Sequence, residues 1–364
     1  MTMIPLKSDQ FRHKLQRLNP FTKPSSVYSA YLASFSLHSA FALWTAWGVL
    51  ALYVHRPFGL ATYPAMMALP ITYLCTLRRS ATTQTLLLTA ALSIITFWLY
   101  TQKPSNDRPW QDEVEEQIRF HQIGDQVTVE NVRNFEWISK TEYVPRWEVR
   151  NYDLSQIKSL DLIVSIWDND NIGHTLLSFG FDDGQRIAVS FEIRKEIGES
   201  FSSIGGFFRQ YEMTIIAADE KDIIYTRSNA RGERVYLYPL SLPRSEIREL
   251  FLAYLRAAET LAAHPSWYNT LLDNCTTAIF DLMDPIRAIP NDYRILLSGR
   301  LPEYLYEIGM IDTELSFNEL KTRALINPKV DQYTYHNPIS SAAFSQKIRE
   351  NLPDPTIEFD KQVK

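Results

Sequence analysis

Three long apolar runs without an acidic residue, lysine or arginine fill the N-terminal third of the chain. They cover roughly residues 31–54, 58–77 and 83–100. A helix that crosses the hydrocarbon core of a bilayer needs ~17–25 apolar residues, and each run comes close to that length. The first run is long and lies well inside the chain, which does not fit a cleaved signal peptide. The sequence therefore predicts a bundle of three transmembrane helices over residues 31–101.

Basic residues beside these runs predict their orientation. The leader, residues 1–30, carries Lys7, Arg12, Lys14, Arg17 and Lys23. Positive charge is retained on the cytoplasmic side, so we expect a cytoplasmic N-terminus and, after three crossings, a large domain outside. Pro64 and Pro70 interrupt the second run. If that run dips into the membrane and returns, only two crossings remain and the large domain stays in the cytoplasm.

The remainder of the chain has the pattern of an α+β domain. Residues 102–125 are polar and are predicted as a linker. Short alternating runs in 126–313 predict a mostly antiparallel sheet, and helical periodicity takes over after Pro243. Residues 314–364 are polar with scattered prolines, and we expect a loosely ordered tail. The net charge of −5 gives no basic excess, so a nucleic-acid partner is not expected.

Cys275 is the candidate nucleophile. The chain has 2 cysteines, and Cys75 lies within the second apolar run, which leaves Cys275 without a disulfide partner in its domain. The sequence Asn274-Cys275-Thr276-Thr277 predicts a helix start, where the helix dipole stabilises a thiolate. Asn274 is a good helix N-cap; its amide is also a candidate for orienting groups or polarising a carbonyl. The backbone N–H of Cys275 is the more natural oxyanion donor.

His174 is the candidate base for this thiol. Among the 7 histidines, it alone lies within a predicted strand of the α+β domain, with Gly173 beside it. A thiol with a pKa near 8.5 is only a few per cent ionised at neutral pH, so a nucleophilic cysteine needs such a base. The alternative is a half-exposed strand histidine without a chemical role.

The turn after this strand predicts a third member, Glu192. A three-residue loop, Asp182-Asp183-Gly184, places Glu192 directly opposite His174, about 5 Å away between β-carbons. A two-residue turn would place Ile193 there instead and direct Glu192 to the other face. Alternation favours the first register, because Ile187, Val189, Phe191 and Ile193 then share one buried face. Pairing of Glu192 with Arg194 or Lys195 is the structural alternative.

Several other kinds of site have no motif in this sequence. It contains no metal-binding cluster of histidine and cysteine, no phosphate-binding glycine loop and no GxSxG motif. We therefore expect neither a metal nor a cofactor.

Several motifs resemble, in the same order, the bacterial family called the Lnb N-terminal periplasmic domain. They are Val132-Arg133-Asn134-Phe135, Pro145-Arg146-Trp147-Glu148, His174 to Phe181, Glu192 to Glu196, and Asn274 to Thr277. The resemblance covers roughly residues 120–300. It implies a permuted papain-like fold of the NlpC type, with Cys275 as nucleophile and His174 as base. It also implies the bacterial inner membrane, a periplasmic domain, and N-acylation of lipoproteins through a thioester. The place of Glu192 as third member is our inference.

Three functions follow as hypotheses. The first is an inner-membrane thiol acyltransferase, in which Cys275 takes an acyl chain from a membrane lipid and passes it to an amine, with lipoproteins as candidate acceptors. The second is a cysteine peptidase or amidase that acts on cell-envelope peptides or peptidoglycan. The third is a membrane module without catalytic activity.

Overall fold

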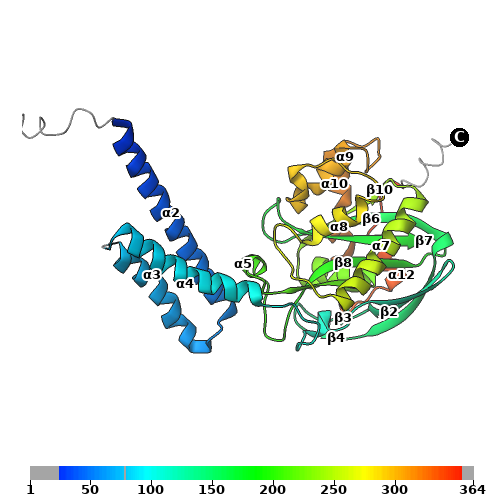
Figure 1. The fold of residues 1–364 in the computed structure, drawn as a ribbon. Helices are drawn as coiled ribbons and strands as arrows, with labels where there is room; N and C mark the ends of the chain where they lie inside the picture. Colours follow the sequence, from blue (N-terminus) through cyan, green and yellow to red (C-terminus); the bar gives the residue numbers. More distant parts are fainter. Residues whose placement is uncertain (1–23, 78, 355–364) are drawn as a thin grey trace, which may run out of the picture. The chain divides into compact units, whose positions relative to one another are not determined.

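The structure is a computed structural model that describes residues 24–77 and 79–354. These residues form two compact units, which divide after Gln102. The first unit is helical and the second combines a sheet with helices, as Figure 1 shows. The predicted α+β class of the second unit is confirmed.

The helical unit contains three apolar helices. They are α2 (Pro24–His55), α3 (Thr62–Thr76) and α4 (Ala81–Thr101). The Tyr73 hydroxyl donates to the carbonyl of His38 at 3.2 Å, which joins α3 to α2. The indole N–H of Trp44 donates to Thr96 Oγ1 at 3.4 Å, which joins α2 to α4.

Two of these helices are long and apolar enough to cross a membrane. The segments are Leu37–His55 in α2 and Thr82–Thr101 in α4. Helix α3 has 15 residues and contains Pro70. At 1.5 Å per residue it is about 22 Å long, less than the ~30 Å hydrocarbon core. The expectation of three full crossings is therefore supported for the first and third runs, while the second forms a helix too short to cross the core unaided.

The second unit is built on one large sheet with the strand order β1-β2-β9-β8-β7-β6-β10, to which β5 is added beside β2. The strands are β1 (Arg119–Ile123), β2 (Gln126–Arg133), β5 (Trp147–Asp153), β6 (Ile157–Ile166), β7 (His174–Phe181), β8 (Arg186–Arg194), β9 (Glu212–Ala218) and β10 (Arg234–Leu240). Neighbours are antiparallel except β2 and β9, which meet in parallel at Arg133 and Ala218. A separate ribbon pairs β3 (Glu136–Trp137) with β4 (Tyr143–Val144).

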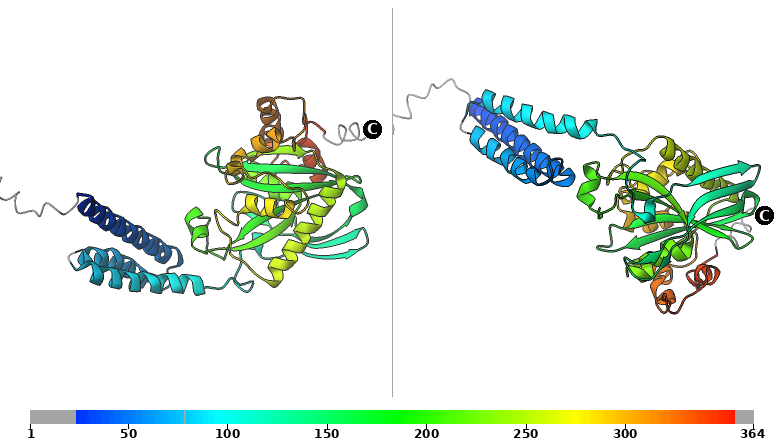
Figure 2. Two further views of the ribbon diagram at one scale, coloured as in Figure 1. Left: turned by 45° about the horizontal axis from the view of Figure 1, so that its top comes forward. Right: turned by 90° about the horizontal axis from the view of Figure 1, so that it is seen from below.

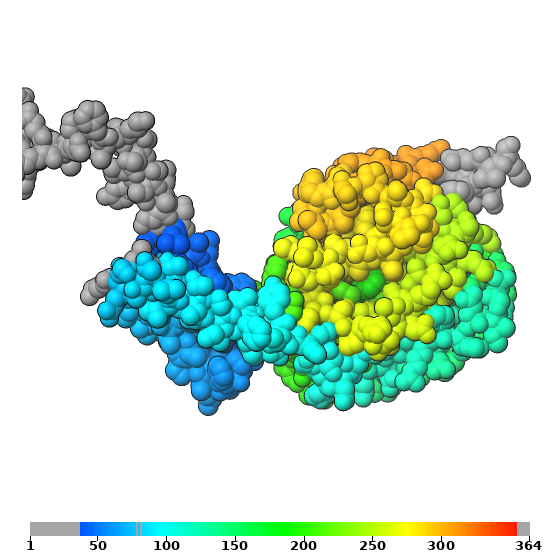
Figure 3. Space-filling model, in the orientation of Figure 1, coloured from blue at the N-terminus to red at the C-terminus, as the bar shows by residue number. Residues whose placement is uncertain are grey.

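Helices cover both faces of this sheet. They are α5 (Ser203–Phe207), α6 (Glu220–Tyr225), α7 (Arg244–Ala263), α8 (Cys275–Met283), α9 (Leu301–Glu307), α10 (Phe317–Ala324), α11 (Asn327–Val330) and α12 (Ser341–Lys347). A π-helical turn, η4 (Thr226–Ala230), continues α6. Figure 2 shows α7 and the red C-terminal helix α12 on opposite sides of the sheet. In Figure 3 the yellow residues of α7 and α8 lie over the green residues of the sheet.

Strand β8 is buried on both faces, whereas its alternating pattern predicts a single buried face. Ile187, Val189 and Phe191 are buried in the core beneath α7, as their alternation predicts, whereas Ile193 near the end of β8 is only partly buried. However, Ala188 and Ser190 on the other face are also buried. The second face is covered by α6 and the C-terminal helices, a layer that the pattern of a single strand does not indicate.

The predicted loose tail is wrong for residues 314–354. Helices α10, α11 and α12 lie in this segment, and Val330, Phe344 and Ile348 are fully buried in the core of the second face. Ser316 and Glu319 form a capping box at the start of α10. These helices have 4 to 8 residues, too few for a helical period to show in a sequence this polar.

The predicted linker at 102–125 is also wrong, because it belongs to the folded unit. The backbone N–H of Ser105 donates to Glu212 at 3.0 Å. Arg194 lies over the ring of Trp110, with 4.4 Å from the guanidinium carbon to the ring centre. Strand β1 then begins at Arg119. Several contacts thus hold this segment against the domain, although many of its charged side chains face solvent.

Candidate active site

The hairpin between β7 and β8 has the register predicted from its turn. Gly184 adopts a φ of +88°, and the N–H of Phe181 donates to the carbonyl of Gln185 at 3.0 Å. Ser178 pairs with Ala188. Counting back along the ladder places Glu192 across from His174, at the opposite end of the hairpin from the turn.

His174 contacts its strand neighbours through one ring nitrogen. Its Nε2 lies 3.0 Å from Glu192 Oε1 and 2.7 Å from Ser190 Oγ. Ser190 Oγ in turn donates to Glu192 Oε1 at 2.8 Å. The hydroxyl of Ser190 therefore accepts from the imidazole and donates to the carboxylate. This arrangement fixes the ring with Nε2 toward the carboxylate, which leaves Nδ1 for the thiol.

Arg227 is a second cation beside Glu192, and sequence reasoning missed it. Its NH2 donates to Glu192 Oε1 at 2.7 Å and its NH1 to the carbonyl of Ile223 at 2.8 Å. The side chain is only 7% exposed. It projects from the π-helical turn η4, and such turns occur frequently at functional sites. No sequence motif marks this turn, so the pairing follows only from the fold.

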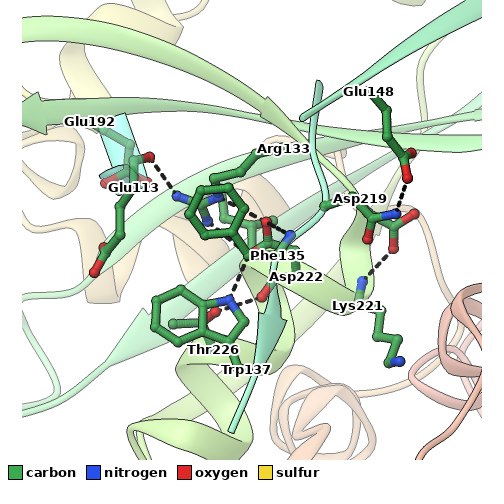
Figure 4. Close-up of polar contacts among 12 residues, drawn as sticks. Glu113, Arg133, Phe135, Trp137, Glu148, Glu192, Asp219, Lys221, Asp222 and Thr226 are labelled. Carbon is green, nitrogen blue, oxygen red and sulfur yellow. Dashed lines mark hydrogen bonds and ion pairs between the residues drawn. The ribbon is translucent and has the colours of Figure 1, made fainter. Parts of the chain in front are cut away.

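A buried ion pair fixes the helix that carries Arg227. Asp222 accepts from Arg133 at 2.9 and 3.1 Å, from the N–H of Phe135 at 2.9 Å and from the indole of Trp137 at 2.8 Å. Figure 4 shows these donors converging on the carboxylate. A buried carboxylate is tolerated where charge and hydrogen bonds satisfy it in this way. The network anchors α6 and η4 to the segment that follows β2.

Cys275 is the first residue of α8, and Asn274 caps this helix. Asn274 Oδ1 accepts from the N–H groups of Thr276 and Thr277 at 2.9 and 3.1 Å, and its Nδ2 donates to the carbonyl of Thr270 at 3.0 Å. Thr277 completes a capping box. The side chain of Asn274 is thus engaged in orienting the helix start. The cap uses the next two N–H groups and not that of Cys275.

The thiol lies beside His174 and the beginning of β7. The charge of His174 and the backbone N–H of Thr175 both act on it and lower its pKa. Thr175 Oγ1 lies 3.1 Å from Thr276 Oγ1, which joins β7 to α8 at this point. Cys275 is 7% exposed. The four residues singled out from the sequence, Cys275, His174, Glu192 and Asn274, therefore occupy one site.

The electrostatics of this site favour a thiolate beside an imidazolium. Burial opposes ionisation of Cys275, but the charge and hydrogen bond of His174 lower the pKa of the thiol to about 7. Burial also opposes protonation of His174, yet Glu192 and the thiolate raise its pKa to about 9. Although burial disfavours the Glu192 carboxylate, His174 and Arg227 hold its pKa well below its usual range. Near neutral pH the thiol of Cys275 is therefore partly ionised beside a protonated His174.

The comparison with protein families identifies the segment that contains this site. Residues 143–299 match the family model described as the Lnb N-terminal periplasmic domain. This segment is similar to that family. The match confirms the resemblance that the sequence motifs indicate. No curated protein matches the chain, and no solved structure matches it.

The matched range, residues 143–299, which we call the Lnb segment, contains the site residues but not all of the residues that hold them in place. Cys275, His174, Glu192 and Arg227 lie within the matched range, whereas Arg133 precedes it. The helices α10 to α12 follow it. The description as a periplasmic domain and the two apolar helices long enough to cross a membrane together fit a membrane protein with a periplasmic domain. Two crossings return the chain to the side on which it began, so the cytoplasmic N-terminus stays a prediction.

Metal-ligating side chains do not gather in the part of the chain that the structure describes. Over residues 24–77 and 79–354, no group of three or more His, Cys, Asp and Glu side chains is placed to hold a metal ion.

Proposed function

We propose that the protein is a membrane-anchored thiol acyltransferase with a permuted papain-like catalytic domain. Cys275 forms an acyl-enzyme and passes the acyl chain to an amine, for which the N-terminus of a lipoprotein is the leading candidate. The observation that carries the proposal is the Cys275–His174–Glu192 series at the start of a helix, within a segment of the Lnb family. A nucleophile, a base and a group that orients the base are the parts that covalent acyl transfer needs.

The first half-reaction transfers the acyl group to sulfur. The Cys275 thiolate attacks the carbonyl carbon of a lipid ester and forms a C–S bond and an oxyanion. When the intermediate collapses, the C–O bond to the lipid alcohol breaks. The proton on His174 Nδ1 passes to the departing alkoxide, which leaves as the alcohol. The product is a thioester on Cys275 with neutral His174.

The second half-reaction transfers the acyl group to nitrogen. An acceptor amine attacks the thioester carbonyl, and His174 removes a proton from the attacking nitrogen. The C–S bond then breaks, which gives an amide and restores the thiolate–imidazolium pair. Glu192 accepts a hydrogen bond from Nε2 throughout, so it holds the ring and stabilises its positive form.

The start of α8 provides the oxyanion site in this proposal. The N–H of Cys275 belongs to the first turn of the helix, where N–H groups lack partners within the helix and the dipole is positive. Since the Asn274 cap engages the two following N–H groups, it holds the first turn in place without using that of Cys275. Removal of one such donor in other enzymes costs ~10²–10³ in rate.

Transfer is favoured over hydrolysis by the surroundings of the thiol. Cys275 is part of the apolar core that α7 covers. The fully buried Tyr254 lies nearby, and its pKa is raised by burial and by the charge of the Cys275 thiolate. Apolar surroundings exclude water, the competing acceptor, and suit a hydrocarbon chain. Two helices long enough to cross a bilayer supply a second reason to expect a lipid substrate.

Acyl-enzyme formation tests the proposal. The full chain, reconstituted with phospholipids that carry a labelled acyl chain, is expected to acquire one hydroxylamine-sensitive acyl group, and Cys275→Ser none. Addition of a diacylglyceryl peptide with a free amino terminus should then yield a labelled amide. Release of water-soluble peptides without labelled lipid product would favour the peptidase instead. Absence of any acyl group on Cys275 would overturn the proposal.

A further inference from the structure

Six large apolar side chains are exposed around the end of the sheet that carries the active site. We call them the apolar rim: Trp167, Phe201, Ile204, Phe207, Leu271 and Leu272. Each is between 45% and 71% exposed. Exposed apolar side chains that occur singly are ordinary, but a contiguous group marks a surface that contacts a partner or a membrane.

Contacts between three segments make the rim continuous. The ring centres of Trp167 and Phe201 lie 6.1 Å apart. The hydroxyl of Thr270 donates to the carbonyl of Ser203 at 2.9 Å, which joins α5 to the segment before the nucleophile. In that segment the N–H groups of Leu271 and Leu272 each donate to Asn269 Oδ1 at 3.0 Å. The turn therefore presents both leucines on a fixed backbone.

The rim adjoins the catalytic residues. Leu272 precedes Cys275 by three residues. Ser165 pairs with His174 across β6 and β7, and Trp167 follows Ser165 by two residues. Both the nucleophile and its base are thus flanked by rim residues. A surface that binds the rim therefore lies next to the chain segments that carry Cys275 and His174.

The covalent connection to α4 limits how far this part of the domain lies from a membrane. The candidate span Thr82–Thr101 has 20 residues, or about 30 Å of helix, which equals one hydrocarbon core. Ser105 is the fourth residue after Thr101 and is bound to Glu212. Four extended residues reach at most about 14 Å. Glu212 pairs with Trp267, at the beginning of the segment that leads to Leu271 and Leu272.

We propose that the apolar rim docks on the surface of the phospholipid bilayer and seats its side chains at the boundary between headgroups and acyl chains. This inference rests on the proposed function and deepens it, because it names the surface through which the thiol meets its lipid donor. Apolar and aromatic side chains, tryptophan above all, are suited to this boundary. The bilayer is favoured over a protein partner because the short connection brings the Glu212 end of the domain close to any membrane that α4 crosses.

Site-directed fluorescence on the full chain tests this docking. In a Cys75→Ser, Cys275→Ser background, Leu272→Cys is labelled with an environment-sensitive fluorophore and placed in nanodiscs that hold one copy each. The matched control is Asp183→Cys, in the turn at the far end of β7; eight strand residues separate the two ends by about 26 Å. Spin-labelled phospholipids are expected to quench the label at 272 and not that at 183.

Two outcomes of this measurement would overturn the docking. Equal quenching at both positions would show that the domain has no preferred face toward the bilayer. A label at 272 that is shielded from water but insensitive to spin-labelled lipid would show that protein covers the rim.

A second variant separates docking from chemistry. Leu271→Glu together with Leu272→Glu is expected to reduce acylation of Cys275 from bilayer phospholipid. The reaction of Cys275 with a short, water-soluble p-nitrophenyl ester should be unchanged, because that donor needs no membrane. Loss of both reactions would mean that the variant disturbs the site, and the fluorescence result then decides alone. Failure of the wild-type chain with both donors would overturn the proposed function and not the docking.

Discussion

At the scale of single residues, one oxygen of Glu192 accepts from three donors, and this arrangement controls the charge of the site. His174, Ser190 and Arg227 lie 3.0, 2.8 and 2.7 Å from Oε1. Two of them are cations when His174 is protonated. The carboxylate therefore remains ionised, and its charge is the main reason why the pKa of His174 is raised to about 9 despite burial.

Glu192→Gln should lower the pKa of His174. The amide keeps the shape of the side chain but removes the charge that raises this pKa, so the value should fall from about 9 toward the ordinary ~6.5. Since the proposed first half-reaction needs the proton on His174, the alkaline limb of the pH–rate profile should move down by about one to two pH units. An unchanged limb with reduced activity would point to a structural role.

The pKa of the Cys275 thiol should lie well below the ~8.5 of a free thiol. Because His174 lowers the pKa of Cys275 to about 7, the thiolate is present above that pH and is lost as the pH falls through it. Alkylation by iodoacetamide in a Cys75→Ser background should therefore rise with a midpoint near pH 7. His174→Ala should move the midpoint above the ~8.5 of a free thiol, since burial raises the pKa and the charge of His174 no longer opposes it. A midpoint near ~8.5 in the unaltered site would contradict the ion pair.

At the scale of elements, the start of α8 fixes the position of the Cys275 thiol. Asn274 fixes the first turn of α8, and the contact of Thr276 with Thr175 ties that turn to β7. The π-helical turn η4 acts in the same way from the other face of the sheet, because it holds Arg227 against Glu192. Helix α8 contributes the thiol, strands β7 and β8 contribute the imidazole and the carboxylate, and η4 contributes the guanidinium.

Asn274→Ala should cost about 1 kcal/mol of folding stability, the usual effect of a lost N-cap, and should slow alkylation of Cys275. Ser340→Ala is the matched control, because Ser340 caps α12 by accepting from the N–H of Ala343 at 3.3 Å. Both variants should lower the unfolding temperature by similar amounts, measured by circular dichroism. Only Asn274→Ala should alter thiol reactivity; an equal effect of both would refute the local role.

At the scale of the whole molecule, the C-terminal helices belong to the fold of the second unit. Arg349, just after α12, donates to Asp161 at 2.7 Å and also contacts Glu220, so it links the C-terminal segment to β6 and α6. Phe344 packs in the core of the second face, near Tyr225. This segment therefore supports the layer that carries η4 and Arg227.

Phe344→Ala should cost about 3–5 kcal/mol, as is typical for a buried phenylalanine. The side chain is 0% exposed. Tyr335→Ala is a suitable control, because Tyr335 is 38% exposed and surface changes usually stay within ~0.5 kcal/mol. Denaturant unfolding, followed by fluorescence, measures both. A loss below about 1 kcal/mol for Phe344→Ala would indicate that the segment is not part of the cooperative unit.

Local patterns in the sequence indicate the main strands, helix α7, the start of α8 and the register of the β7–β8 hairpin. These features depend on neighbours in the chain: the Asp182-Asp183-Gly184 turn sets the pairing, and Asn274 with Thr277 sets the cap. For that reason the sequence alone is sufficient to pair His174 with Glu192. The second apolar run shows the limit of such patterns, because its composition indicates a span but its helix ends after 15 residues.

Local sequence motifs are enough to identify the candidate reactive groups of the site. Cys275, His174 and Glu192 each lie within such a motif. Folding adds what these motifs do not contain: Arg227 beside the carboxylate, Ser190 between the carboxylate and the ring, and an ordered C-terminal segment. The difference arises from distance along the chain. Glu192 and Arg227 are separated by 35 residues and Arg349 and Asp161 by 188, and no local preference encodes contacts that exist only once both faces of the sheet are covered.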